Sequence, residues 1–267
     1  MVRYFLFYKL LKIQHFLFYI KKFIFTIAGN GSKTGNHFID LVVTQKYCEE
    51  EGRNKSIMSD KVIENNQVTV MGEVVTEFQF SHEVFGEGFY MLEISVKRLS
   101  NSEDRIPLMI SERLIDVTQD YRGEYIYVTG QFRSYNRHEE QKNRLVLSVF
   151  VREIAFVEEE MDASKTNQII LEGYICKLPV YRKTPLGREI ADLLLAVNRP
   201  YGKSDYIPCI CWGRNARYVS GFDVGQHVQL IGRIQSRDYV KKLSETETQT
   251  RTAYEVSVSK LECVEDL

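Results

Sequence analysis

The feature that most restricts how this chain can fold is an internal repeat. The stretch "NQVTVMGEVV" from Asn66 matches "NQIILEGYIC" from Asn167, an offset of 101 residues. At the same offset "DRIPLMI" aligns with "DYIPCIC", and after one inserted residue "GEYIYVTGQFRS" aligns with "GQHVQLIGRIQS". A shared register of this length predicts the duplication of one module of roughly 100 residues.

Each copy has the pattern of a β module. Tyr90, Leu92, Ile94 and Val96 recur at every second position, as in a strand with one buried face. Final strands are expected at residues 144–157 and 252–264, and "RNARYVSGFDVGQ" in the second copy favours a short helix closed by a glycine turn.

Five short strands with a helix between the third and fourth is the order of an OB-fold. We therefore predict an all-β fold of two tandem OB-fold five-stranded Greek-key barrels, each with a short helix between strands 3 and 4. The barrels are expected at residues 62–160 and 165–267. Gly72, Gly130, Gly173 and Gly232 fall inside predicted strands, which indicates bulges or sharp barrel corners.

Residues 1–57 do not fit the repeat. Residues 4–28 are rich in Phe, Tyr, Leu and Ile, but lysines interrupt the run, so neither a membrane span nor a signal peptide is predicted. Because the composition suits AT-rich codons, we expect Met58 to be the native start and residues 1–57 to be a mis-annotated or disordered extension. The alternative is an amphipathic anchor at a membrane surface.

The formal net charge of −1 hides a strong polarity along the chain. From Asn66 to Glu160 there are 10 basic and 17 acidic side chains, a net charge of −7. From Lys165 to Lys242 there are 13 basic and 6 acidic side chains, a net charge of +7. Opposite charges in separate segments indicate that the two copies have different partners.

The basic copy also carries exposed aromatic candidates. Tyr206 and Trp212 are six residues apart on one predicted strand, so they share a face with Pro208 and Ile210. Ile207, Cys209 and Cys211 then point into the core. Aromatic rings beside Arg199, Lys203 and Arg214 offer stacking surfaces and phosphate-neutralising charges, which single-stranded nucleic acid requires.

The stretches "NQIILEGYI", "YRKTPLGREIADLLLAVNRPYG", "YIPCICWGRNARYV" and "VQLIGRIQSRDY" resemble bacterial single-stranded DNA-binding proteins. The resemblance covers residues 167–264. It implies base stacking by Tyr201, Tyr206, Trp212 and Tyr239. It also implies backbone contacts at or beside Arg182, Lys183, Arg199, Arg233 and Arg237.

The first copy departs from this pattern at the aligned positions. Ser100 stands in place of Tyr201, Arg105 in place of Tyr206 and Ser111 in place of Trp212. Tyr135 and Arg133 are candidates for a remnant of the site. We expect this acidic barrel to serve dimerisation or partner docking.

Two functions follow from the resemblance. The first is a single-stranded DNA-binding protein acting in replication, recombination or repair, in the cytoplasm at the nucleoid. The alternative is an adaptor of the primosomal replication type, whose barrels mainly bind partner proteins, because the family's flexible linker and acidic tip do not follow the final strand. A homodimer supplying four barrels is expected.

No catalytic chemistry is predicted. The sequence shows no nucleophile–base pair, no paired carboxylates and no second cysteine pair or nearby histidine to complete a zinc site with Cys209 and Cys211. We therefore expect no enzyme activity, no cofactor and no metal, with both cysteines packed in the core.

Overall fold

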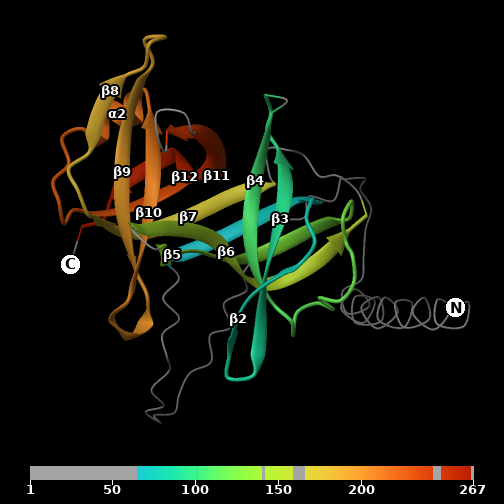
Figure 1. The fold of residues 1–267 in the computed structure, drawn as a ribbon. Coiled ribbons are helices and arrows are strands. Elements are labelled where there is room, and N and C mark those ends of the chain that lie inside the picture. The colour runs from blue at the N-terminus through green and yellow to red at the C-terminus, as the bar shows by residue number, and fades with distance from the viewer. Residues whose placement is uncertain (1–64, 101, 140–141, 159–165, 243–247, 266–267) are drawn as a thin grey trace, which may run out of the picture. The chain divides into compact units, whose positions relative to one another are not determined.

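Twelve β-strands and one short α-helix make up the described part of the chain (Figure 1). A computed structural model describes residues 65–100, 102–139, 142–158, 166–242 and 248–265. The strands in the first copy are β1 (Asn66–Val74), β2 (Gln79–Val84), β3 (Glu87–Lys97), β4 (Glu103–Ser111), β5 (Tyr125–Glu139) and β6 (Lys142–Val157). In the second copy they are β7 (Asn167–Ile175), β8 (Val180–Lys183), β9 (Glu189–Asn198), β10 (Ser204–Trp212), β11 (His227–Lys242) and β12 (Thr248–Cys263), with α2 at Arg214–Val219.

Strand pairing closes each copy into a ring of five strands. In the first ring β1 pairs with β3, β3 with β4, β4 in parallel with β6, β6 with β5, and β5 again with β1. The second ring repeats this order as β7, β9, β10, β12, β11 and back to β7. The predicted all-β class is confirmed. In each ring the five strands enclose one common interior.

Apolar side chains fill both interiors because alternate strand positions point inward. Leu92, Ile94 and Val96 on β3 are buried, as their spacing predicts. Leu193, Leu195 and other inward residues of β9 do the same in the second ring. Burial of these aliphatic side chains supplies most of the stabilising free energy.

The two rings join through an antiparallel pairing of β1 with β7. In this pairing Val68 lies opposite Ile169, and these are equivalent residues of the two copies. A pseudo-two-fold axis therefore passes between them. Both rings belong to one compact unit, Ser59–Leu267.

Two glycines stand at irregular positions of the long hairpins. Gly130 and Gly232 lie at register shifts in the β5–β6 and β11–β12 ladders. A Cβ at Gly130 would lie 2.2 Å from the carbonyl oxygen of Phe150, and one at Gly232 would lie 2.4 Å from that of Ser257. No larger residue fits without displacing a backbone, so the predicted bulges are confirmed at these two positions.

The structure corrects the prediction in two places. Residues 112–124 of the first ring form turns with no helix, because the Asp116 carboxylate accepts the Thr118 backbone N–H and the Gln119 amide and so stabilises a turn. The strands β2 and β8 were not predicted. Every described residue in them is exposed, so neither face carries an apolar pattern.

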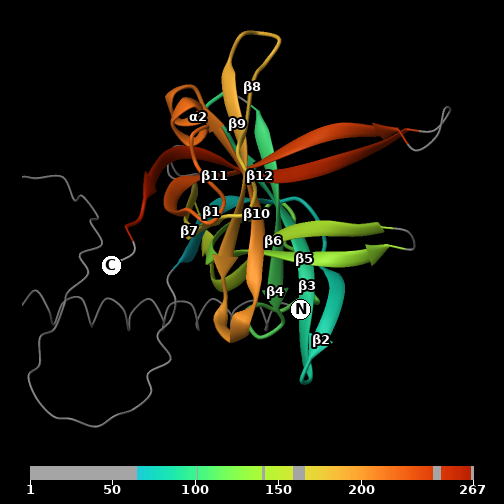
Figure 2. The same ribbon diagram turned by 90° about the vertical axis from the view of Figure 1, so that its left-hand side faces the viewer.

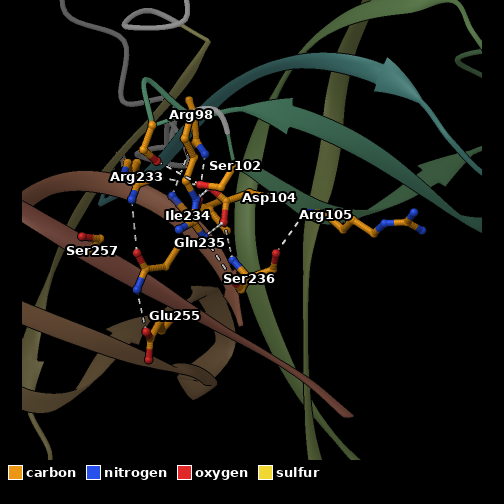
Figure 3. Close-up of polar contacts among 12 residues, drawn as sticks. Arg98, Ser102, Asp104, Arg105, Arg233, Ile234, Gln235, Ser236, Glu255 and Ser257 are labelled. Atoms are coloured by element: carbon orange, nitrogen blue, oxygen red, sulfur yellow. Dashed lines mark hydrogen bonds and ion pairs between the residues drawn. The ribbon is translucent and has the colours of Figure 1, made fainter. Parts of the chain in front are cut away.

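A buried carboxylate, Asp104, links the first ring to the second (Figure 3). Arg98 Nε donates to Asp104 Oδ2 at 2.7 Å, and the backbone N–H of Ser236 on β11 donates to Oδ1 at 2.7 Å. Arg98 Nη2 also donates to the Ser236 carbonyl at 3.0 Å, and the Arg105 N–H donates to Ser236 Oγ at 2.9 Å. We call this set the Asp104 clasp.

The pseudo-two-fold axis generates a matching set, the Asp205 clasp. Here Arg199 pairs with buried Asp205, which accepts the backbone N–H of Ser134 on β5 of the first ring. Arg199 Nη2 donates to the Ser134 carbonyl at 2.9 Å, and the Tyr206 N–H donates to Ser134 Oγ at 2.8 Å. The first ring thus binds Ser236 on β11 of the second ring, and the second ring binds Ser134 on the equivalent strand β5 of the first.

Residues 1–57, predicted to be an extension, lie outside the described residues. None of the helices in the described segments has the length and apolar character that crossing a bilayer requires. The membrane-anchor alternative for residues 1–57 therefore stays a prediction.

We expect Asp205→Ala to destabilise the protein by about 3 kcal/mol, because removing one partner leaves the Arg199 charge and the Ser134 N–H without their acceptor. Denaturant unfolding measures this change. Asp120→Ala is the control, since exposed Asp120 pairs only with exposed Arg122 among the ion pairs of the described residues, and its midpoint should match the wild type. An unchanged midpoint for Asp205→Ala would show that the clasp contributes nothing.

Candidate nucleic-acid interface

The central strand of the candidate interface is β10. Its inward residues Ile207, Cys209 and Cys211 are buried, whereas Tyr206 is 46% and Trp212 38% exposed, which agrees with the predicted alternation. Ile210 is a correction, because it is buried although it was predicted to face outward. It lies opposite Asp192 on β9 and Ser257 on β12, so strands flank it on both sides.

Two contacts fix the aromatic residues of β10. Trp212 Nε1 donates to Ser257 Oγ on β12 at 3.2 Å, which anchors the polar edge of the indole while the ring stays partly exposed. The backbone of Tyr206 is held by Ser134 in the Asp205 clasp. The aromatic side chains of Tyr206 and Trp212 are thus presented from a hydrogen-bonded strand and not from a loop.

Tyr201 and Tyr239 extend the aromatic surface beyond β10. Tyr201 is 95% exposed in the turn Pro200–Gly202 and has φ of 64°, a left-handed conformation that costs free energy for a residue with a Cβ. Tyr239 is 39% exposed on β11. The aromatic side chain of Tyr201, exposed at this turn, is therefore accessible for stacking.

Tyr239 lines a cleft of about 680 Å³ between two long hairpins. The β5–β6 and β11–β12 hairpins extend to the same side of the molecule (Figure 2). Pro208 from the outward face of β10 and Tyr135 from β5 also line this cleft. Among the lining side chains Lys241 and Arg251 are basic and Glu93 is acidic. We call it the inter-hairpin cleft.

The structure places the predicted basic residues in two groups. Arg199 and Arg233 have partners within the protein: Arg199 belongs to the Asp205 clasp, and Arg233 Nη1 lies 3.1 Å from Asp104 Oδ2. Arg182 pairs with Asp192 at 2.9 Å, with both side chains exposed. The other four are exposed: Lys183, Lys203, Arg214 and Arg237. Contact of these residues with nucleic acid stays a prediction.

The clasps themselves were missed by the sequence reasoning, which assigned Arg199 to nucleic-acid contact and gave the other clasp residues no role. Asp104 and Asp205, Arg98 and Arg199, and Ser134 and Ser236 are identical in the aligned copies. Most surface positions have diverged between the copies, so identity of a polar residue was the signal that would have found them. The sequence could not show that each pair acts across the ring boundary.

Cys209 and Cys211 lie in the core and are poor metal ligands. Burial raises the pKa of Cys211 to about 12 and that of Cys209 well above its ordinary value, so both thiols stay protonated at neutral pH. In the described part of the chain no group of three or more His, Cys, Asp or Glu side chains is arranged to hold a metal ion.

The comparisons with known proteins point to the same region. Residues 166–264 match the model of the single-strand binding protein family. The match spans the second ring, so the resemblance found from the residues alone is confirmed for this part of the chain.

Curated relatives agree with the family match. The chain is 36% identical over 80 residues to single-stranded DNA-binding protein 3 of Listeria innocua, covering 27% of this chain and 50% of that protein. It is also 36% identical over 80 residues to single-stranded DNA-binding protein A of Bacillus subtilis, covering 27% and 46%. The chain thus spans about half the length of the curated relatives it matches.

A solved structure shares the fold over both rings. The single-stranded DNA binding protein from Thermus aquaticus aligns with 75% of this chain and 93% of its own, with a TM-score of 0.56 and 20% sequence identity. At this identity the likeness concerns the fold, and it extends beyond the 99 residues that the family match spans.

We expect a thiol reagent such as DTNB at pH 8 to leave Cys209 and Cys211 unmodified in the native protein, because their raised pKa values and burial suppress the reactive thiolate. Exposed Cys263 is the internal control and should react. Peptide mass spectrometry reads each site. Modification of Cys209 or Cys211 as fast as Cys263 would contradict the core assignment, and both should react after unfolding in guanidinium.

Proposed function

We propose that the protein binds single-stranded DNA, without catalysis, through the second ring. The two rings are then tandem OB-fold barrels, at residues 62–160 and 165–267, and α2 is the helix between the third and fourth barrel strands of the second. Strand order supports the proposal, because a five-strand closure with one parallel pair is repeated in both copies. The protein would act in replication, recombination or repair, in the cytoplasm at the nucleoid.

The observation that carries the proposal is the exposed aromatic face of β10. Large aromatic side chains usually become buried because their apolar area is large. Tyr206 and Trp212 instead stay partly exposed on one strand face, in the ring whose segment from Lys165 to Lys242 carries a net charge of +7. A base offers a flat apolar partner for such rings, and its phosphate offers a charge of the opposite sign.

Binding would combine two energetic contributions. Each base stacked on Tyr201, Tyr206, Trp212 or Tyr239 contributes about 1–3 kcal/mol. Each phosphate neutralised by a basic side chain releases counterions and gives a log–log salt slope of about −0.7. The exposed Lys183, Lys203, Arg214 and Arg237 are available for this role, with Arg182 exchanging its exposed partner Asp192 for a phosphate.

Assembly is proposed to be a homodimer of the chain, which supplies four barrels. Within one chain, β1 and β7 already join two rings about a pseudo-two-fold axis. Sedimentation at micromolar concentration is the direct measurement of the association between chains.

We expect oligo-dT to quench the fluorescence of Trp212, the single tryptophan of the chain, because a stacked base lies against the exposed indole. The quenching should weaken as salt rises. Titration of a protein beginning at Met58, at low and high salt, measures both effects. A folded protein that shows no quenching would contradict the proposal and favour the adaptor function.

We expect Tyr206→Ala to weaken oligo-dT binding by about 1–3 kcal/mol without changing the salt slope, because stacking is lost and no charge is removed. Fluorescence anisotropy of a labelled oligonucleotide measures affinity and slope together. Tyr218→Ala is the matched control: Tyr218 is an exposed tyrosine on α2 whose hydroxyl contacts Cys263 at the end of β12, and its loss should leave affinity unchanged. Equal affinities for the wild type and Tyr206→Ala would remove Tyr206 from the site.

A further inference from the structure

The first ring contains a cleft of its own, although its sequence lacks the family's aromatic residues. The cleft has a volume of about 600 Å³, within the range of about 300–1,000 Å³ typical of ligand sites. We call it the Arg133 cleft. Its lining residues come from β2, β3, β4, β5, β6 and the Asp205 clasp: Gln79, Phe80, Ser81, His82, Met91, Met109, Arg133, Ser134, Tyr135, Ser148, Phe150 and Arg199.

The aromatic platform of this face has moved from one strand to its neighbour. In the second ring Trp212 on β10 stands over Ser257 on β12. In the first ring the equivalent of Trp212 is Ser111, whereas Phe150 on β6 occupies the place of Ser257, since Met109 pairs with Phe150 as Ile210 pairs with Ser257. The serine and the aromatic residue have thus exchanged strands between the two copies, so this face of the first ring still carries an aromatic side chain.

A continuous stack leads across the wall of the cleft. The His82 ring stacks on Phe89 with centroids 5.2 Å apart, and Phe89 packs against Phe150 at 5.8 Å. The guanidinium carbon of Arg133 lies 3.9 Å from the centre of the Phe150 ring. This cation–π contact fixes the orientation of Arg133.

Arg133 has unused binding capacity. Its Nη2 donates to Gln131 at 2.8 Å, but Nε is buried without a hydrogen-bond partner among the described residues. An unpaired buried donor costs free energy that an acceptor in the cleft would recover. Burial, and then the neighbouring Arg199 charge, lowers the pKa of Arg133 to about 10, so the guanidinium is charged and poorly solvated at neutral pH.

The lining selects an anionic ligand with flat apolar parts. It includes no Asp or Glu side chain, although this copy as a whole carries a net charge of −7. Phe80 is 62% exposed, and Tyr135 is also exposed, so both aromatic side chains have surface available for stacking. Serine hydroxyls from β2, β5 and β6 complete the lining. A nucleotide unit has the matching parts, a base to stack and a phosphodiester to accept from Arg133.

The cleft is also continuous with the candidate interface of the second ring. Gln79, Met91 and Tyr135 line both the Arg133 cleft and the inter-hairpin cleft, where Tyr239 and Pro208 of the second ring also lie. Ser134, between Arg133 and Tyr135, binds the backbone of Tyr206. A strand on the β10 face therefore has a direct path into the first ring.

We propose that the Arg133 cleft is a second nucleotide-binding site, which holds part of the same single strand that the second ring binds. Arg133 contacts a phosphate, and Phe80 and Tyr135 stack on bases. This inference rests on the proposed function of the second ring, and it assigns the first ring a direct part in binding, in place of the dimerisation or docking role expected from its sequence.

The test uses two variants of the full chain and two oligonucleotides. Arg133→Gln removes the charge and installs the residue that the second ring has at the equivalent position, Gln235, so the fold has a precedent for it. Phe80→Ala removes an exposed ring. Phe85→Ala is the control, a fully exposed phenylalanine next to β2 that does not line the cleft. Oligo-dT of about 8 nucleotides is of a size for one barrel, and about 32 nucleotides for two.

We expect both variants to bind the long oligonucleotide about fivefold or more weakly and the short one as the wild type does. Arg133→Gln should also reduce the salt slope for the long oligonucleotide by about 0.7, whereas Phe80→Ala should leave the slope unchanged. Anisotropy measures these affinities. Quenching of Trp212 by the short oligonucleotide is a separate reading of the second ring.

The outcomes separate the two proposals. Normal Trp212 quenching with unchanged long-oligonucleotide affinity in both variants would overturn the inference alone, and is the result expected if the cleft binds a peptide. Absence of quenching and binding in the wild type would overturn the proposed function. An equal loss of affinity in Phe85→Ala would show that the effect does not come from the cleft.

Discussion

The arrangement of the two rings depends on two buried carboxylates. Asp104 and Asp205 are each almost fully buried, and burial of a charge is costly unless it is paired and hydrogen-bonded. Each receives an arginine from its own ring and a backbone N–H from the other ring. The acceptors are satisfied only when both rings are in place, so the pairing of β1 with β7 and the two clasps specify one relative orientation.

This constraint extends to the candidate binding surface. The Asp205 clasp fixes the start of β10, where Tyr206 lies, by means of Ser134 from the first ring. The neighbours of Ser134 along β5 are Arg133 and Tyr135, which line the cleft of the first ring. One short segment of β5 therefore serves both surfaces, and a change in ring orientation would alter the two together.

The fold was largely predictable because a repeat and a period-two pattern both leave clear signals in sequence. The alternation of β10 predicted which face holds Tyr206 and Trp212, and failed only at Ile210, whose burial comes from neighbouring strands. The sequence could not reveal β2 or β8, whose residues are exposed on both faces. Nor could it show that Arg199 binds Asp205, since the same arginine in a strand-end position also suits a phosphate. Such contacts depend on tertiary pairing, which one sequence does not encode locally.

The β1–β7 pairing has a consequence for how the surface can vary. In a symmetric pair of identical chains, every substitution appears twice, once in each subunit, and must be tolerated in both places. Here the two halves meet as such subunits would, with Val68 opposite Ile169, yet they are encoded separately. Trp212 and Ser111, or Phe150 and Ser257, can therefore differ without disturbing the shared axis. Covalent fusion turns a symmetric interface into a scaffold for two independently adjustable faces.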